Sequence, residues 1–160
     1  MSVHTILALV QDHPGVLHRV ASLIRRRGYN IESLTVGRCE MPGVSRMTLV
    51  VDADVEQVTK QLNRLVEVLK VQDVTHDRTV ERETVLVKVH APAPSRAGLI
   101  SLTTSHGART VDVGIATLVF ELTESPKKVD AFLDLLTPIG ITEMIRSGRI
   151  AMAQADGSGD

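Results

Sequence analysis

Apolar residues recur along the first half of the chain with two alternating periods. The segment VHTILALV, residues 3–10, is typical of a strand, and the apolar residues from Val16 to Ile24 are then spaced three and four apart, as on one face of a helix. Gly28 supplies a helix stop. The same periods predict further strands at residues 30–38, 45–52 and 68–74, and a helix from Val55 to Val66. The predicted order is β-α-β-β-α-β.

The second half of the chain repeats this order. A charged link at residues 75–83 is followed by alternating valines that predict a strand at residues 84–91, and a helix begins near Ser95 and ends at Gly107. The remaining predicted elements are strands at residues 109–113, 115–123 and 141–154 and a helix at residues 126–136. The sequence therefore predicts an α+β chain of two ferredoxin-like βαββαβ units.

These units set the expected domain boundaries. We expect a first domain at residues 1–78, a second at residues 79–155, and a disordered tail at residues 156–160, where the sequence is DGSGD. Helices would cover one face of each antiparallel sheet and leave the opposite face free to pair with another copy. We therefore expect an oligomer.

Composition narrows the classes of function without choosing one. The 160 residues are 43% hydrophobic and 23% charged with a formal net charge of -1, which is typical of a soluble globular protein that has no overall attraction to nucleic acid or an anionic membrane. No apolar stretch approaches the roughly 20 residues that span a bilayer, and the N-terminal residues lack the features of a signal peptide. The single cysteine, Cys39, agrees with a reducing compartment. We expect a cytoplasmic protein.

The sequence offers little support for catalysis or metal binding. The six histidines are scattered, and none forms an HExxH pattern or an i, i+4 pair. His76 between Asp73 and Asp77 permits a proton relay, for which a solvated linker is the simpler interpretation. Cys39 beside Arg38 permits an activated thiol, for which a structural cysteine is the simpler interpretation. We predict no catalytic residue and no metal ligand in this chain.

RNA binding is an obvious alternative for a βαββαβ unit, because RNA-recognition motifs stack bases on aromatic residues of their central strands. The only aromatic residues are Tyr29, Phe120 and Phe132, and the central strands ILALV and RMTLVVD contain none. The basic run Arg25–Arg27 suits the negative end of a helix dipole without any phosphate ligand. The pattern therefore argues against RNA binding.

The turn QDHPGVL, residues 11–17, leaves two interpretations open. A helix N-terminus has unpaired N–H groups that bind carboxylates, Gly15 allows close approach, and Asp12 accepts an ammonium group, so the turn suits a free amino acid. Alternatively, Asp12 is the N-cap and Pro14 the first helical residue, with no ligand. Asn30, whose amide both donates and accepts, is a candidate for a second half of the site.

Several segments resemble the regulatory (small) subunit of acetolactate synthase, also called acetohydroxyacid synthase. They are DHPGVLHRVASLIRRRGYNIESLTVG, SRMTL, QLNRLVEVLKV, VERETVLVKV and DAFLDLLTPIGITEMIRSGRIAM, and they cover most of the chain. A PGVL segment after a strand is common to ACT domains generally. The order RRGYNIESLTVG, SRMTL and VERE is far more specific.

The resemblance implies an N-terminal ACT domain, a ferredoxin-like C-terminal domain and a homodimer whose ACT domains pair edge to edge. It implies no cofactor in this chain, because the family's large subunit holds thiamine diphosphate, Mg²⁺ and FAD and condenses pyruvate with pyruvate or 2-ketobutyrate. In the family, the small subunit raises this activity in branched-chain amino acid biosynthesis. It also makes the activity sensitive to feedback inhibition, usually by valine.

The resemblance also implies an effector site between two ACT domains. Carried over by matching position, its residues are Asp12, His13, Gly15 and Val16 of one chain with Asn30 and Ile31 of its neighbour. The family commonly has asparagine at the position of Asp12, and an aspartate there accepts an ammonium group but repels a carboxylate. The second unit opens with APAPSRAGL, which has no Pro-Gly turn, so only the first unit is expected to bind effector.

Two other functions stay open at this point. An amino-acid-sensing ACT module that serves a different enzyme or regulator would bind amino acids without a thiamine-dependent partner. A stand-alone enzyme would show turnover as the purified chain, which we do not expect.

Overall fold

The computed structural model describes residues 2–156 of the chain. Its elements are β1 (Ser2–Gln11), α1 (Val16–Arg26), β2 (Asn30–Arg38), β3 (Val44–Ala53), α2 (Val55–Leu62), β4 (Val68–Asp73), β5 (Thr79–His90), the 3₁₀ turn η1 (Ala93–Ser95), α3 (Arg96–Ser105), β6 (Arg109–Val113), β7 (Thr117–Glu124), α4 (Pro126–Leu136), the 3₁₀ turn η2 (Thr137–Ile139), β8 (Ile141–Arg146) and β9 (Ile150–Ala153). No helix in the described part of the chain is long and apolar enough to cross a membrane.

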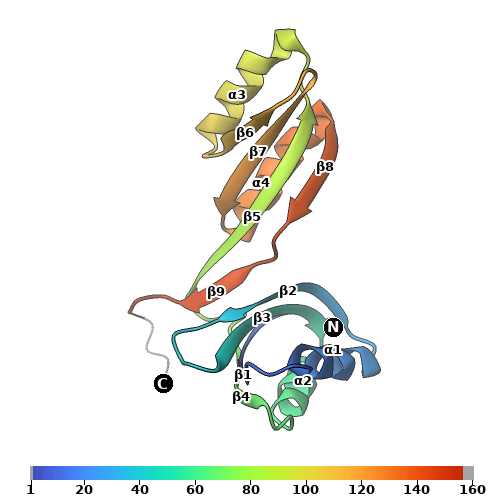
Figure 1. Ribbon diagram of the computed structural model, residues 1–160, viewed down its shortest axis with the longest axis vertical. Helices are drawn as coiled ribbons and strands as arrows, with labels where there is room; N and C mark the ends of the chain where they lie inside the picture. The colour runs from blue at the N-terminus through green and yellow to red at the C-terminus, as the bar shows by residue number, and fades with distance from the viewer. Residues whose placement is uncertain (1, 157–160) are drawn as a thin grey trace. The chain divides into compact units, whose positions relative to one another are not determined.

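These elements form two compact units (Figure 1), one of residues 2–80 and 149–156 and the other of residues 81–148. The first sheet has the strand order β2-β3-β1-β4, and the second has the order β6-β7-β5-β8, with β9 pairing with β5 off this path. Each unit also contains two α-helices. The predicted α+β fold of two ferredoxin-like βαββαβ units is confirmed.

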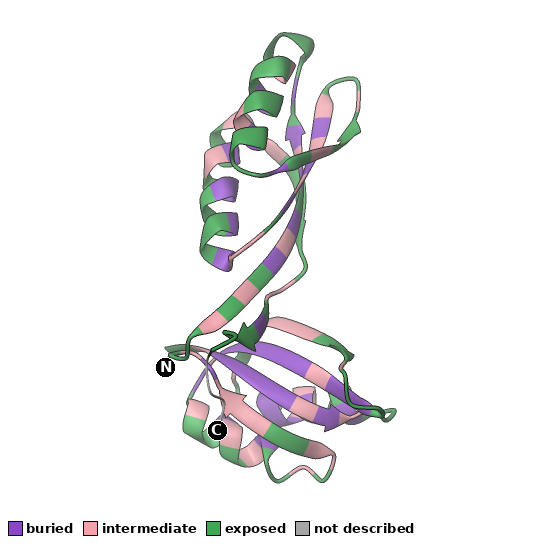
Figure 2. Ribbon diagram, turned by 90° about the vertical axis from the view of Figure 1, so that its left-hand side faces the viewer, coloured by how far each residue is buried: buried purple, intermediate pink, exposed green. Residues whose placement is uncertain are grey.

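The core of the first unit lies between its sheet and its two helices. Every second residue of β1 from Ile6, and of β3 from Met47, is apolar and faces the buried stripes of α1 and α2. The buried positions, purple in Figure 2, run along these central strands. The members of this core are Ile6, Ala8, Val10, Val16, Val20, Leu23, Ile24, Met47, Leu49, Val51, Ala53, Val58 and Leu62.

The strand β5, most of which lies in the second unit, begins earlier than the sequence predicts. The strand starts at Thr79, so residues 79–83 of the expected charged link are extended and paired. Glu83, in this stretch, is buried, and the Arg146 guanidinium donates a hydrogen bond to its carboxylate. A buried carboxylate needs such a partner. Arg146 lies far from Glu83 along the chain, so the local pattern of charged residues did not predict this part of the strand.

The C-terminal end of the chain differs from the expected domain organisation. We expected residues 141–154 to form one closing strand and residues 149–155 to belong to the second domain. The structure instead divides this segment at Gly148, whose φ is +85°, and residues 149–156 belong to the first unit. Of the expected tail, residues 157–160 lie outside the described residues.

This C-terminal segment covers part of the outer face of the first sheet, opposite the helices. The backbone N–H of Arg149 donates to Ser33 Oγ at 3.1 Å, and Thr35 Oγ1 donates to the Arg149 carbonyl at 3.1 Å. Arg46 donates to the Ala151 carbonyl at 3.0 Å, and Ala151 is buried with apolar residues of the first unit. The outer face that we expected to be free for a second copy is therefore partly occupied by the chain itself.

Replacing Thr35 with valine should loosen this covering segment. Valine keeps the shape of threonine but removes the hydrogen bond from Thr35 to the Arg149 carbonyl, so we expect a loss of about 1 kcal/mol in the free energy of unfolding. Urea unfolding measures the loss, and hydrogen exchange of residues 149–153 should become faster. Val36→Thr, at an exposed position of the same strand, is the control and should change neither quantity. Equal exchange in the two variants would contradict this role of Thr35.

Candidate functional site

The turn between β1 and α1 contains three of the six predicted site residues, Asp12, His13 and Gly15, and Val16 begins the helix that follows. The backbone N–H of Asp12 donates to the Gly43 carbonyl at 2.9 Å, and that of His13 donates to the Gln11 carbonyl at 3.0 Å. Gly15 has a φ of +86°, and a Cβ atom at this position would meet nothing within 4 Å. Glycine adopts this left-handed conformation at little cost. The backbone at Gly15 is therefore open to a ligand.

The start of α1 tests the capped-turn interpretation. The helix begins at Val16, its N-cap is Gly15, and no side chain caps it. The interpretation with Asp12 as the N-cap and Pro14 as the first helical residue is therefore wrong. The first turn has no acidic residue, so it keeps the partial positive charge of a helix N-terminus.

Val16 and His13 flank Gly15 but differ in what they offer a ligand. The Val16 side chain is only 5% exposed and belongs to the core of the first unit. Val16 can therefore offer the turn only its backbone. Its N–H donates to the His13 carbonyl at 3.4 Å. The His13 residue is exposed.

Asp12 has a partner that the sequence analysis missed. Its carboxylate accepts a hydrogen bond from Arg38 Nε at 3.2 Å, and the side chains of Asp12 and Arg38 are 40% and 88% exposed. An exposed ion pair of this kind contributes at most about 1 kcal/mol to stability. Only the pairing of β2 with β3 brings Arg38 to this end of the sheet. The Asp12 carboxylate stays accessible to a ligand cation.

Asn30 and Ile31 begin β2 and line an open depression of about 450 Å³. The other lining residues are Ala21, Ile24, Arg25, Gly28 and Tyr29. The chain reaches this strand through a turn in which Gly28, with a φ of +73°, donates to the Arg25 carbonyl at 2.9 Å. The depression combines an apolar wall, an amide and a guanidinium.

The two halves of the predicted site lie at opposite ends of the first sheet. Asn30 pairs with Asp52 of β3, whereas Arg38, the ion-pair partner of Asp12, pairs with Ser45 at the other end of that strand. At the usual rise per residue, Ser45 and Asp52 are roughly 23 Å apart. One chain therefore does not bring Asp12 and Gly15 together with Asn30 and Ile31.

The other candidate groups do not form a site. Asp73 accepts hydrogen bonds from Thr75 and lies 3.3 Å from His4, rather than contacting His76. Burial alone would raise the pKa of Asp73, but the Thr75 hydrogen bonds and the nearby His4 hold that pKa below its usual value. Asp77 accepts from Gln72 instead. The proton relay permitted by the sequence is not assembled.

Cys39 and the metal-ligating residues were also candidates. Cys39 Sγ lies 3.5 Å from the Val44 carbonyl in the turn between β2 and β3, where the cysteine is half-buried. Within residues 2–156, no three histidine, cysteine, aspartate or glutamate side chains come together as a metal site.

Family comparisons cover both units. Residues 6–70 match the AHAS small subunit-like ACT domain, and residues 82–155 match the small subunit of acetolactate synthase. A probable acetolactate synthase small subunit from Archaeoglobus fulgidus is 50% identical over 156 residues, which are 96% of this chain and 98% of the relative.

The chain belongs to the acetolactate synthase small-subunit family. The acetolactate synthase small subunit of Mycolicibacterium smegmatis is 45% identical over 94% of this chain and 91% of its own length. The crystal structure of the acetolactate synthase small subunit from Thermotoga maritima superposes with a TM-score of 0.84 at 37% identity, covering 95% of this chain and 97% of that one. The resemblance read from the sequence is confirmed, and the first unit is an ACT domain.

The open turn of the ACT domain leads to a prediction about Gly15. Gly15→Ala places a Cβ on a left-handed residue, so the free energy of unfolding should fall by about 1 kcal/mol. Gly15→Asn should lose less, because asparagine tolerates this conformation better. Denaturant midpoints of the two variants measure the difference. Equal stability of Gly15→Ala and the unchanged chain would mean that the turn does not hold a positive φ.

Proposed function

We propose that this small subunit activates a thiamine-diphosphate-dependent large subunit and makes it sensitive to a branched-chain amino acid, with valine as the first candidate. The thiamine diphosphate, Mg²⁺ and FAD belong to the large subunit in this proposal. Family membership supports the regulatory role, since the relatives of this chain are small subunits of acetolactate synthase.

The effector site in this proposal is shared by two chains. β2 is an edge strand of the first sheet, so the hydrogen-bonding groups on one side of it are available to another strand. Two copies of β2, paired antiparallel about a two-fold axis at its middle residue Leu34, place Asn30 of one chain opposite Arg38 of the other. The turn of Asp12 and Gly15 lies beside that Arg38. Such a dimer would bring Asn30 of one chain close to the turn of Asp12 and Gly15 in the other chain.

Each end of a free amino acid has a partner in this arrangement. The effector carboxylate meets the N–H groups near Gly15, where the helix start carries no side-chain cap. The ammonium group meets the Asp12 carboxylate of the same chain and the Asn30 amide of the second copy. Ile31 and the apolar wall of the depression hold an aliphatic side chain. His13 borders the site, and Val16 contributes only its backbone.

The second unit has no comparable opening at its strand–helix turn. There the Arg96 side chain donates to the carbonyls of Ala91, Gly114 and Ile115. The Arg96 side chain therefore uses the carbonyl groups around the turn that follows β5 as hydrogen-bond acceptors. The contrast supports effector binding by the first unit alone.

The observation that carries the proposal is the open, uncapped turn at Gly15 combined with the free edge of β2. Effector binding would favour one arrangement of the paired ACT domains, with a coupling to the large subunit of about 1 to 3 kcal/mol. That coupling is large enough to change activity several-fold.

Gly15→Asp should separate inhibition from activation. The new carboxylate occupies the place of the effector carboxylate, so the inhibitory concentration of valine should rise about tenfold or more, equivalent to ~1.4 kcal/mol. Activation of the large subunit should persist. Assays of a purified acetolactate synthase large subunit with the variant, over a range of valine concentrations, measure both effects.

Gly107→Asp is the matched control, because Gly107 also has a positive φ, +84°, and lies in the second unit. It should leave valine inhibition unchanged. Unchanged inhibition in Gly15→Asp would show that the site is elsewhere. Amino-acid binding by the chain without activation of any large subunit would instead favour an ACT module that serves a different enzyme.

A further inference from the structure

Arg25 lies in the last turn of α1 and faces the depression that Asn30 and Ile31 line. It is the one charged residue among the seven that line this depression. The residue is exposed. Its guanidinium is therefore available at the half-site that β2 contributes.

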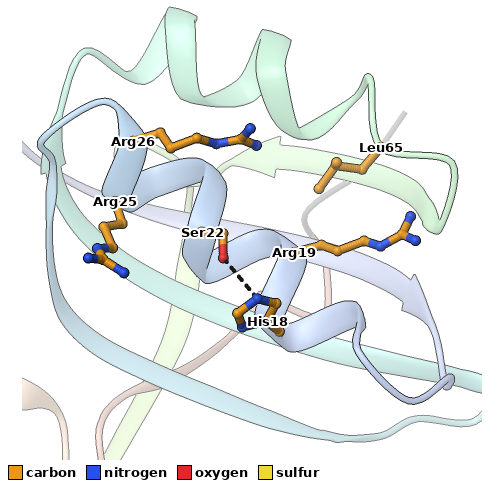
Figure 3. Close-up of a pocket in the computed structure, with 6 residues that line it drawn as sticks. All are labelled: His18, Arg19, Ser22, Arg25, Arg26 and Leu65. Carbon is orange, nitrogen blue, oxygen red and sulfur yellow. Dashed lines mark hydrogen bonds between the residues drawn. The ribbon is translucent and has the colours of Figure 1, made fainter.

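The neighbouring arginines of α1 have a different surrounding. Arg26 and Arg19, together with His18, Ser22 and Leu65, border a hollow on the other flank of the helix. Arg25 borders this hollow too, but Figure 3 shows its guanidinium turned away from those of Arg19 and Arg26. Arg19 is also engaged by Glu67. Of these three arginines, only Arg25 lines the depression that contains Asn30.

The charges of the shared site give Arg25 a role. Asp12 brings a negative charge to the turn, and its partner Arg38 offsets it at 3.2 Å. An amino acid adds both an ammonium group and a carboxylate, and the carboxylate would lie close to the Asp12 carboxylate. A planar guanidinium binds a carboxylate through two parallel hydrogen bonds. Arg25 supplies that group from the chain opposite Asp12.

We propose that Arg25 of one chain binds the α-carboxylate of the effector that Asp12 and Gly15 of a second copy hold. Arg25 thereby makes a free carboxylate a requirement for binding. This inference rests on the proposed two-chain effector site and adds a specificity-determining residue to it.

Calorimetric titration of the full chain with valine and with valinamide, which lacks the carboxylate, tests the inference. The unchanged chain should bind valine at least about tenfold more tightly than valinamide. Arg25→Gln should lose most of this preference by weakening valine alone. Arg25→Lys, which keeps the charge without the planar fork, should retain part of it.

Arg26→Gln is the matched control, because Arg25 and Arg26 share the last turn of α1 and the same favourable position at the helix C-terminus. The two variants should lose similar stability, but Arg26→Gln should keep the preference for valine. An unchanged preference in Arg25→Gln, or an equal loss in Arg26→Gln, would overturn the role of Arg25 while leaving the effector site in place. Failure of the unchanged chain to bind any amino acid would instead contradict the proposed function itself.

Discussion

β1 is hydrogen-bonded to β3 along its whole length on one side and to β4 on the other, and these antiparallel ladders set the positions of the functional residues. Gln11 meets Val44 where β1 ends, so the turn of Gly15 lies at that end of the sheet. β2 runs along the far side of β3, and its first residue, Asn30, lies at the opposite end. A slip of one residue would turn core residues such as Ile6 to the outer face. The core therefore enforces the separation of the two half-sites.

That separation and the covered outer face together define how two copies can meet. The segment from Arg149 to Ala153 is bonded to Ser33, Thr35 and Arg46 on the outer face of the first sheet. A second copy stacked on this face would have to displace those bonds. The proposed pairing along the edge of β2 needs no such displacement and would join the separated halves. The same segment is also hydrogen-bonded to β2, the strand that begins with Asn30.

The sequence predicted the elements well where periodicity is strong, because one buried face requires a fixed spacing of apolar residues. The stripe of α1, beginning at Val16, is an example, and it already indicated that the Val16 side chain belongs to the core. The family segments predicted six site residues, of which Asp12, His13 and Gly15 lie in one turn and Val16 begins the next helix. Local pattern does not record which unit a short strand packs against, so the packing of β9 with the first unit was missed, although β9 pairs with β5.

Other features could not be predicted from the sequence, because the residues involved are brought together only by folding. Arg38 and Asp12 are brought together only by strand pairing, and no spacing rule connects them. Arg25 looked like part of a basic run that complements the helix dipole, and only the folded chain separates it from Arg26. The capped-turn interpretation failed because a left-handed glycine can begin a helix without a side-chain cap, which residue preferences alone do not show.

A complementation measurement tests most directly whether the effector site is built from two chains. Mixed dimers of a Gly15→Asp chain and an Asn30→Ala chain, isolated by separate affinity tags, should regain valine binding at one of their two sites. Mixed dimers of an unchanged chain and a Gly15→Asp/Asn30→Ala chain should have no intact site, although they carry the same substitutions. The reverse result, with no binding in the first dimer and one site in the second, would place the whole site within a single chain and contradict the account.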